Sequence, residues 1–121
     1  MRAAEAIDLA EKIRRIEDYW SPKIVAQVGD TEVKLARIQG TFDWHTHEKE
    51  DELFLVLDGR LKLEFRDGEV WIEPGQLYVV PHGVEHRPVA SEEVQIMLVE
   101  PAGTRNTGHR TTDRTVEAEW I

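Results

Sequence analysis

Two stretches of the sequence decide which fold this chain adopts. Residues 45–59 read HTHEKEDELFLVLDG, and residues 75–86 read GQLYVVPHGVEH. His45 and His47 lie two residues apart, so on an extended strand both imidazole rings project from the same face. A cluster of carboxylates ends at Glu52, where a returning antiparallel chain would bring one carboxylate towards the two rings. His86 closes the second stretch. A His-x-His pair alone is weak evidence for a metal site, but the residues around it strengthen that interpretation.

Short apolar segments separated by Gly and Pro surround these two stretches. We expect strands at residues 23–28, 32–38, 53–57, 60–65, 70–72, 77–80, 87–90 and 94–99. Asp58-Gly59 and Asp67-Gly68 are hairpin signals. Short strands in this arrangement are typical of an antiparallel sandwich or barrel. Residues 53–57 are apolar without alternation, which predicts a strand that is buried on both faces.

The two ends of the chain differ from this β-rich centre. Apolar residues recur at steps of three and four over residues 3–20, which predicts an N-terminal helix that ends at Ser21-Pro22. That helix would pack against the domain or against a partner subunit. Residues 101–121 contain many Gly and Thr residues, which predicts an irregular tail with a short strand near residues 115–120. We therefore divide the chain into a helix at 1–21, a barrel at 22–100 and a tail at 101–121.

Composition narrows the possible functions. The 121 residues are enough for one domain with a core of its own. The absence of cysteine excludes disulfides, thiolate metal sites and a cysteine nucleophile. The net charge of −9 argues against binding to nucleic acid or to an anionic membrane, and suits a protein that handles a small molecule or a cation. No apolar stretch reaches the ~20 residues of a membrane helix and no secretory leader is visible, so we expect a cytoplasmic location.

The first stretch resembles the first motif of the cupin family. That motif has His-x-His, a glutamate three or four residues on, and a closing glycine six residues later. Four residues separate His47 from Glu52, and six separate Glu52 from Gly59. Gly40 stands five positions before His45, whereas the family usually has its leading glycine six positions before. We interpret this departure as a loop difference of one residue.

The second stretch resembles the second cupin motif, which runs from a glycine through Pro-x-Gly to a histidine. Gly75, Pro81-His82-Gly83 and His86 keep every spacing of that motif. Fifteen residues lie between the two motifs, as in small single-domain cupins. The family often has Asn where Ala90 stands, and we expect this change to affect packing rather than metal binding. The resemblance extends over residues 40–90.

The resemblance implies an all-β fold, the cupin-type double-stranded β-helix or jelly-roll barrel, preceded by the N-terminal α-helix. It also implies a site for one divalent transition metal (Fe, Mn, Ni or Zn) with four protein ligands: His45, His47, Glu52 and His86. Three imidazoles and one carboxylate suit such metals. Four ligands close a tetrahedral zinc site, whereas they leave two positions open on an octahedral metal. The ligand count therefore bears on function only once the metal is known.

Some residues near the motifs have more than one interpretation. Asp51 competes with Glu52 as the carboxylate ligand, but only Glu52 fits the family spacing. We expect His82 to be a turn residue, His109 to be exposed, and Trp44 to face away from the metal. Four apolar residues could line a pocket or belong to the core: Phe42, Phe65, Tyr78 and Met97.

Two main classes of function follow from the resemblance. The first is a metal-dependent enzyme that acts on a small oxygen-bearing molecule, dioxygenase-like or isomerase-like, in which Glu52 could leave the metal and act as a base. The second is a non-enzymatic protein that binds or senses a small ligand through its metal. A cupin that keeps its metal for stability alone is a further possibility. Because the apolar strand at 53–57 needs a cover on its outer face, we also predict a homodimer.

Overall fold

The computed structural model describes residues 5–121 of the chain. Its elements follow one another as α1 (Leu9–Arg14), β1 (Lys23–Val28), β2 (Thr31–Thr41), β3 (Glu52–Asp58), β4 (Leu61–Phe65), β5 (Gly68–Ile72), β6 (Leu77–Val80), β7 (His86–Pro101) and β8 (Glu119–Trp120). The predicted bounds of β1 and β6 are confirmed. The two strands predicted at 87–90 and 94–99 are one continuous strand, β7.

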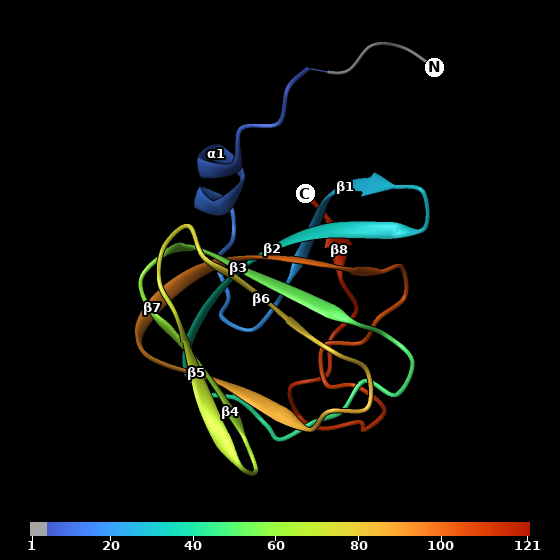
Figure 1. Ribbon diagram of the computed structural model, residues 1–121. Helices are drawn as coiled ribbons and strands as arrows, with labels where there is room; N and C mark the ends of the chain where they lie inside the picture. The colour runs from blue at the N-terminus through green and yellow to red at the C-terminus, as the bar shows by residue number, and fades with distance from the viewer. Residues whose placement is uncertain (1–4) are drawn as a thin grey trace.

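The strands form a single sheet that curves into a barrel (Figure 1). β7 is its central strand, since it pairs antiparallel with β2 along most of its length, with β4 near its start and with β3 near its end. β5 extends the sheet beyond β4, β1 extends it beyond β2, and β6 pairs with β3. The predicted all-β jelly-roll barrel, preceded by a short N-terminal helix, is confirmed.

β7 continues through the polar residues that suggested a break. The irregularity appears as register shifts instead. β7 bulges between Ala90 and Val94 where it pairs with Gly40 and Ile38 of β2, and β3 holds an extra residue between Val56 and Asp58. Glu93, in the middle of β7, accepts a hydrogen bond of 2.6 Å from the Arg37 guanidinium on β2. Charged residues at this point therefore stabilise the strand rather than end it.

The helix is much shorter than the predicted span of residues 3–20. After Arg14 the backbone turns and contacts Arg37 of β2 instead. The Arg37 guanidinium donates a hydrogen bond of 2.7 Å to the Ile16 carbonyl, and Tyr19 forms a parallel β-bridge with Arg37. Tertiary contacts with β2 thus take the place of further helical turns. Ile13 and Ile16 are buried against the barrel, as the apolar stripe predicts. Ala3, the first residue of that stripe, lies outside the described residues.

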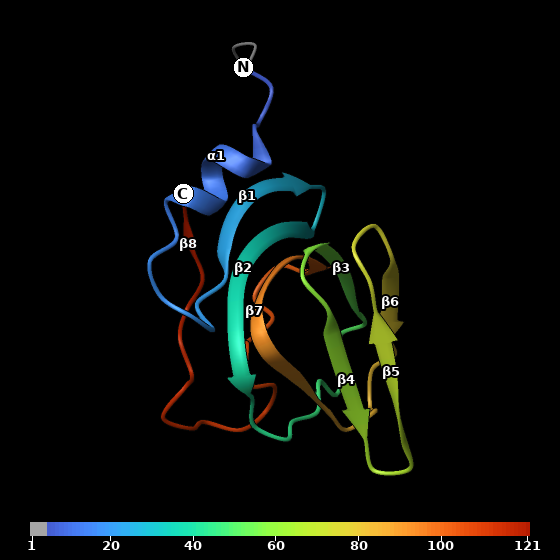
Figure 2. The same ribbon diagram turned by 90° about the vertical axis from the view of Figure 1, so that its left-hand side faces the viewer.

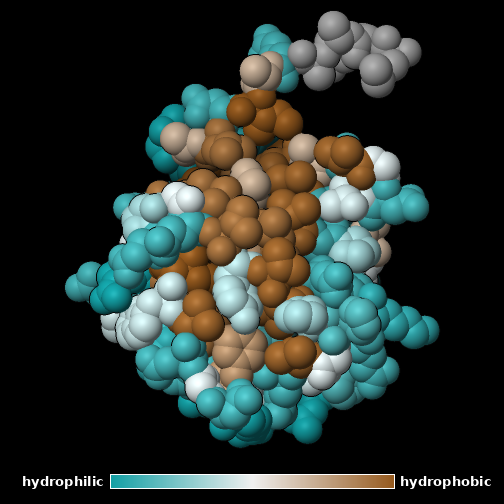
Figure 3. All heavy atoms as spheres, in the orientation of Figure 1, coloured by the Kyte–Doolittle hydropathy of each residue, from teal (hydrophilic) through white to brown (hydrophobic). Residues whose placement is uncertain are grey.

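The two faces of β3 differ in burial. Phe54 and Val56 point into the barrel and are 3 % and 0 % exposed. Leu53, Leu55 and Leu57 point outwards and are only half-buried, so the prediction of burial on both faces is wrong for the single chain. Apolar side chains gather on this side of the molecule, over β3 and β6 and up towards α1 (Figure 3).

The tail runs beside the barrel and returns to its start, where β8 pairs in parallel with β1 (Figure 2). Its loops between residues 102 and 118 lie close to the segment that carries His45 and His47. Among residues 5–121, no helix has the length and apolar character needed to cross a membrane.

Candidate metal centre

Backbone hydrogen bonds bring the two sequence motifs together. The His45 N–H donates to the His86 carbonyl and the His86 N–H donates to the His45 carbonyl, each at 3.0 Å. This antiparallel bridge joins the segment after β2 to the first residue of β7. Glu52 opens β3, which pairs with β6 and β7. Three separate segments therefore deliver their side chains to one end of the barrel interior.

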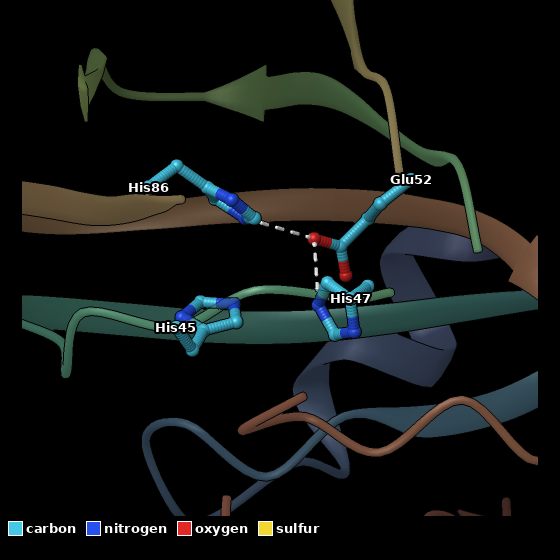
Figure 4. A group of neighbouring side chains, drawn as sticks. All are labelled: His45, His47, Glu52 and His86. Atoms are coloured by element: carbon cyan, nitrogen blue, oxygen red, sulfur yellow. Dashed lines mark hydrogen bonds and ion pairs between the residues drawn. The ribbon is translucent and has the colours of Figure 1, made fainter. Parts of the chain in front are cut away.

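The four predicted ligands meet at one point (Figure 4). One ligand atom from each residue lies within 4.8 Å of the others. The Glu52 Oε1 atom is 3.4 Å from the His47 Nε2 atom and 3.4 Å from the His86 Nε2 atom. All four residues are at most 4 % exposed. A group of three imidazoles and a carboxylate in this arrangement could hold a metal ion.

The hydrogen bonds of the imidazoles test this interpretation. His45 Nδ1 lies 2.9 Å from the Asp43 carbonyl oxygen, and His86 Nδ1 lies 2.9 Å from the Val84 carbonyl oxygen. Because a carbonyl only accepts, each Nδ1 carries a proton. In His45 this leaves the Nε2 lone pair free for the cluster, as in a metal-ligating histidine. Neither ring nitrogen of His47 makes a hydrogen bond of good geometry, although the ring is buried and its Nε2 lies 3.4 Å from Glu52 Oε1. A buried imidazole without a hydrogen-bond partner, next to a carboxylate, suits a transition-metal ligand, so the residues fit the metal.

The electrostatics of the site keep two of the predicted ligands, His45 and Glu52, deprotonated. Burial lowers the pKa of His45 to about 4, and the neighbouring His86 acts in the same direction. Burial works to raise the pKa of Glu52, but the contacts with His47 and His86 outweigh it and hold this pKa well below its ordinary value. At neutral pH, His45 is therefore neutral and Glu52 is ionised. These are the protonation states in which both side chains bind metals.

A buried ion pair beside the site was not predicted from the sequence. Lys34 Nζ donates to Glu100 Oε1 at 2.8 Å and to the Thr104 carbonyl at 3.3 Å. The Glu100 carboxyl also contacts Glu52, and burial together with the negative charge of Glu52 raises the pKa of Glu100 well above its usual range. The chain Lys34–Glu100–Glu52 thus connects a buried ammonium group to a predicted metal ligand.

The position of Lys34 on β2 explains why this pair was missed. The middle of β2 is buried on both faces, so a lysine there can point into the barrel. Lys34 shares the inner face with Ala36 and Ile38, which belong to the barrel core. The available signal was a lysine in phase with these two apolar residues.

A narrow cavity of about 40 Å³ lies beside the predicted ligands. His45 and Glu52 form part of its wall, and Lys34 and Glu100 are the other charged residues that line it. The remaining wall is mainly apolar, with large contributions from Trp20, Ile38, Phe42, Phe54, Ile96 and Leu98. A small molecule in this cavity would have an apolar environment except at the end that faces the ligands.

An aromatic pair forms the outer wall of the cavity. Trp20 stacks on Phe42 with ring centroids 4.7 Å apart. Trp20 has a φ of 60°, and its backbone N–H and indole N–H donate to the carbonyls of Arg37 and Gln39, each at 3.0 Å. Non-glycine residues with positive φ are uncommon and are enriched at functional sites. The sequence analysis placed Trp20 in a helical stripe and so missed its contribution.

The other residues considered from the sequence are not part of the four-residue cluster. Phe42 lines the cavity with its ring centroid 5.4 Å from that of His45, whereas Phe65 and Tyr78 pack against the barrel core and Met97 packs with the helix. His82 is exposed, and both its backbone N–H and its Nδ1 lie 2.8 Å from Asp51 Oδ1. Asp51 is thus outside the cluster. Two further residues behave as expected: Trp44 lies beneath the Arg66 guanidinium, and His109 is exposed.

Comparison with known proteins identifies the family. The model of the cupin domain (Cupin_2) matches residues 31–102, which include all four predicted ligands. The chain belongs to the cupin family. A cupin-2 domain protein from Shewanella frigidimarina is 41 % identical and superposes with a TM-score of 0.77, covering 78 % of this cupin and 93 % of the other chain.

Two further relatives add context. The uncharacterized protein YdbB of Bacillus subtilis is 39 % identical over 64 residues. The matched segment covers 52 % of this cupin and 57 % of YdbB, so the chain spans little more than half the length of that relative. Hydroquinone 1,2-dioxygenase PnpCD, solved with Cd²⁺ and 4-hydroxybenzonitrile, superposes with a TM-score of 0.65 at 21 % identity, covering 72 % of this cupin and 67 % of that chain. The likeness to PnpCD shows a shared fold.

Proposed function

We propose that this cupin binds one divalent transition metal through His45, His47, Glu52 and His86 and acts as an enzyme on a small oxygen-bearing molecule. The observation that carries this proposal is the cavity that reaches the His45 and Glu52 side chains. A buried ligand set without a cavity would suit a purely structural metal. Here a narrow, mainly apolar cavity adjoins two of the predicted ligands, so the metal would not be enclosed on every side.

The residues around the cavity would perform distinct tasks. When bound, the metal supplies Lewis-acid polarisation of a substrate oxygen and, if it is iron, redox chemistry. The apolar walls exclude water and hold the body of the substrate. Glu52 is ionised, so it can accept a proton from a substrate group that enters the cavity. Phe42 and Trp20 present flat aromatic surfaces against which a planar molecule would pack.

The cavity favours a dioxygenase-like reaction over the isomerisation of a sugar phosphate. Lys34 is the only lysine or arginine among the described residues that line it, and its Nζ already donates to Glu100 and to the Thr104 carbonyl. A phosphate group needs unpaired cationic donors, and a sugar needs many polar partners. A phenol or a diketone instead offers an apolar body with oxygen atoms at one end. The substrate class we propose is therefore small, largely apolar and oxygen-bearing.

Ligand binding without turnover is the second candidate function. It is favoured by the small number of titratable groups at the cavity, since Lys34 and Glu100 pair with each other and the rest are predicted metal ligands. An enzyme that needs a separate general acid would have to recruit it from this set. A sensor or carrier needs only the metal and the apolar walls.

Metal analysis of protein purified without an affinity tag tests the site. We expect about one transition-metal ion per chain and a loss of bound metal in the His47→Ala and Glu52→Ala variants. His82→Ala is the matched control, because His82 is an exposed histidine outside the cluster. Metal-free native protein, or equal metal content in all variants, would refute the assignment.

Oxygen uptake distinguishes the two functions. Iron-loaded protein is mixed with catechol, hydroquinone or acetylacetone, and uptake is compared with that of the Ala118→Phe variant. Ala118 lines the cavity from the tail and is not one of the four predicted ligands, so a phenylalanine there should narrow the space while the ligand set stays intact. Uptake that this variant loses while it keeps its iron supports the enzyme. Saturable binding of these compounds without uptake favours the binding protein instead.

We also propose that this cupin forms a homodimer through its outer apolar face. That face comprises Leu53, Leu55 and Leu57 on β3 with Leu77 and Val79 on β6, and the last two are 58 % and 45 % exposed. α1 packs only against the Leu57 end of β3. A second copy brings the same uncharged apolar face, so the two surfaces match without burying an unpaired charge.

A further inference from the structure

The C-terminal tail contacts the metal-ligand segment although it lies beyond the matched cupin domain. The family model ends at residue 102, and the loops that follow lie beside residues 41–46. We propose that the tail positions His45 and His47 for metal binding, an inference that rests on the metal site proposed above. The residues responsible are Gly108, His109 and Thr112, which act through backbone and side-chain contacts with the segment.

Gly108 brings the tail backbone directly against Thr46, the residue between the two histidines. It has a φ of 69°, and a Cβ atom added there would overlap the Thr46 carbonyl group. The next residue, His109, points its backbone N–H and its Nδ1 at the Thr46 carbonyl oxygen, at 3.2 Å and 3.0 Å. Glycine is therefore required at 108 both for its φ and for the close approach.

A second set of contacts fixes the other side of His45. Thr112 Oγ1 donates to Asp43 Oδ2 at 2.8 Å, and the carbonyl of the same Asp43 accepts from His45 Nδ1. Arg114 donates to the Thr41 carbonyl at 2.6 Å. The tail thus holds the backbone on both sides of His45 and at the carbonyl that orients its ring. Between β2 and the bridge to His86, the barrel bonds this segment through the Phe42 N–H and the Pro88 carbonyl, at 3.0 Å, and the tail adds the contacts described above.

The tail is internally braced, so it can hold a neighbouring segment in place. Thr107 is fully buried, and its hydroxyl donates to the Arg110 carbonyl at 2.7 Å and contacts Thr115 Oγ1 at 2.6 Å. The Asn106 side chain bonds the backbone of Arg114 and of Val116, at 2.7 Å and 3.1 Å. These hydrogen bonds connect the two residues before Gly108 to residues 110–116 of the same tail.

A matched pair of glycine substitutions tests the proposal. Gly103 and Gly108 both lie in the tail with positive φ, so alanine strains the backbone at either site, but only at Gly108 would its Cβ meet Thr46. Co²⁺ is titrated into the full-length metal-free protein, and its visible absorption reports both affinity and ligand geometry. We expect Gly108→Ala to weaken Co²⁺ binding at least about tenfold and to change the spectrum. Gly103→Ala should leave both unchanged.

The variant Thr112→Val keeps the test valid if Gly108→Ala fails to fold. It should weaken Co²⁺ binding in the same direction, and Thr112→Ser, which keeps the hydroxyl, should restore it. Equal affinity and spectra for wild type, Gly108→Ala and Thr112→Val would overturn the positioning role, as would equal losses at Gly103 and Gly108. If wild type itself binds no Co²⁺, the metal site fails, which is a different result from failure of the tail's role.

Discussion

The inner and outer faces of β3 show how one strand serves two purposes. Glu52, Phe54 and Val56 point into the barrel, where they supply a predicted ligand, a cavity wall and part of the core. Leu53 and Leu55 alternate with them but remain half-buried on the outside. Both faces are apolar beyond Glu52, so composition does not separate them. Only the position of each residue relative to the barrel decides whether it contributes to the site or to assembly.

Lowering the pH should decrease the free energy of unfolding through His45 in the barrel interior, and not through the apolar outer face of β3. His45 ordinarily titrates near 6.5 and does so near 4 when folded, so the unfolded chain binds its proton first as the pH falls. The contribution of His45 to stability is therefore complete above pH 6.5 and decreases as the pH falls towards 4. The expected loss is about 3 kcal/mol of unfolding free energy in the metal-free protein.

Urea unfolding at pH 7 and at pH 4 measures this loss. His45→Gln is the control, because it removes the titrating ring while the other groups still contribute. The difference between the two pH values should be about 3 kcal/mol smaller in His45→Gln than in wild type. An identical decrease in both proteins would show that His45 is not held neutral by burial.

Alanine substitutions at two adjacent residues compare the inner and outer faces of β3 directly. Val56→Ala removes buried methyl groups from the barrel core and should lower the free energy of unfolding by about 2 kcal/mol. Leu55→Ala removes more atoms but from the half-buried face, and should cost less than about 1 kcal/mol in the monomer. Chemical unfolding at low protein concentration measures both. A larger loss for Leu55→Ala would reverse the assignment of the faces.

The smallest effect on the fold, and the clearest on assembly, is expected from Leu77→Lys. Leu77 is 58 % exposed, so the monomer should change by no more than about 0.5 kcal/mol. In the proposed dimer the lysine would bury a charge and weaken association. Sedimentation equilibrium should show a dimer for wild type and for Val28→Lys, an exposed site on β1, and a monomer for Leu77→Lys. A monomeric wild type would contradict the dimer.

The sequence predicted those features that depend on local patterns. The bounds of β1 and β6 follow from turn residues on either side of apolar runs, and β1 ends at the Gly29-Asp30 turn. The four residues that meet in one cluster could be named as candidate ligands because two motifs with fixed spacings contain them. Both kinds of signal are short-range, so the residues that form them are visible in a single stretch of chain.

Features that depend on distant partners were not predictable in this way. The helix ends early because Arg37, far along the chain, pairs with the residues that would continue it. The Lys34–Glu100 pair joins residues on two strands, and neither residue stands out locally. The tail was expected to be an irregular wrap, since nothing near Gly108 in the sequence indicates that Thr46 lies against it.

The mutual backbone bonds of His45 and His86 have a consequence for folding kinetics. The two residues are far apart in sequence, so their contact closes a long loop and forms only as the barrel itself closes. The complete ligand set therefore does not exist in an early, partly folded chain. A metal that binds only the finished site would leave the folding rate unchanged and slow unfolding. Its main effect would be on how long each folded molecule persists.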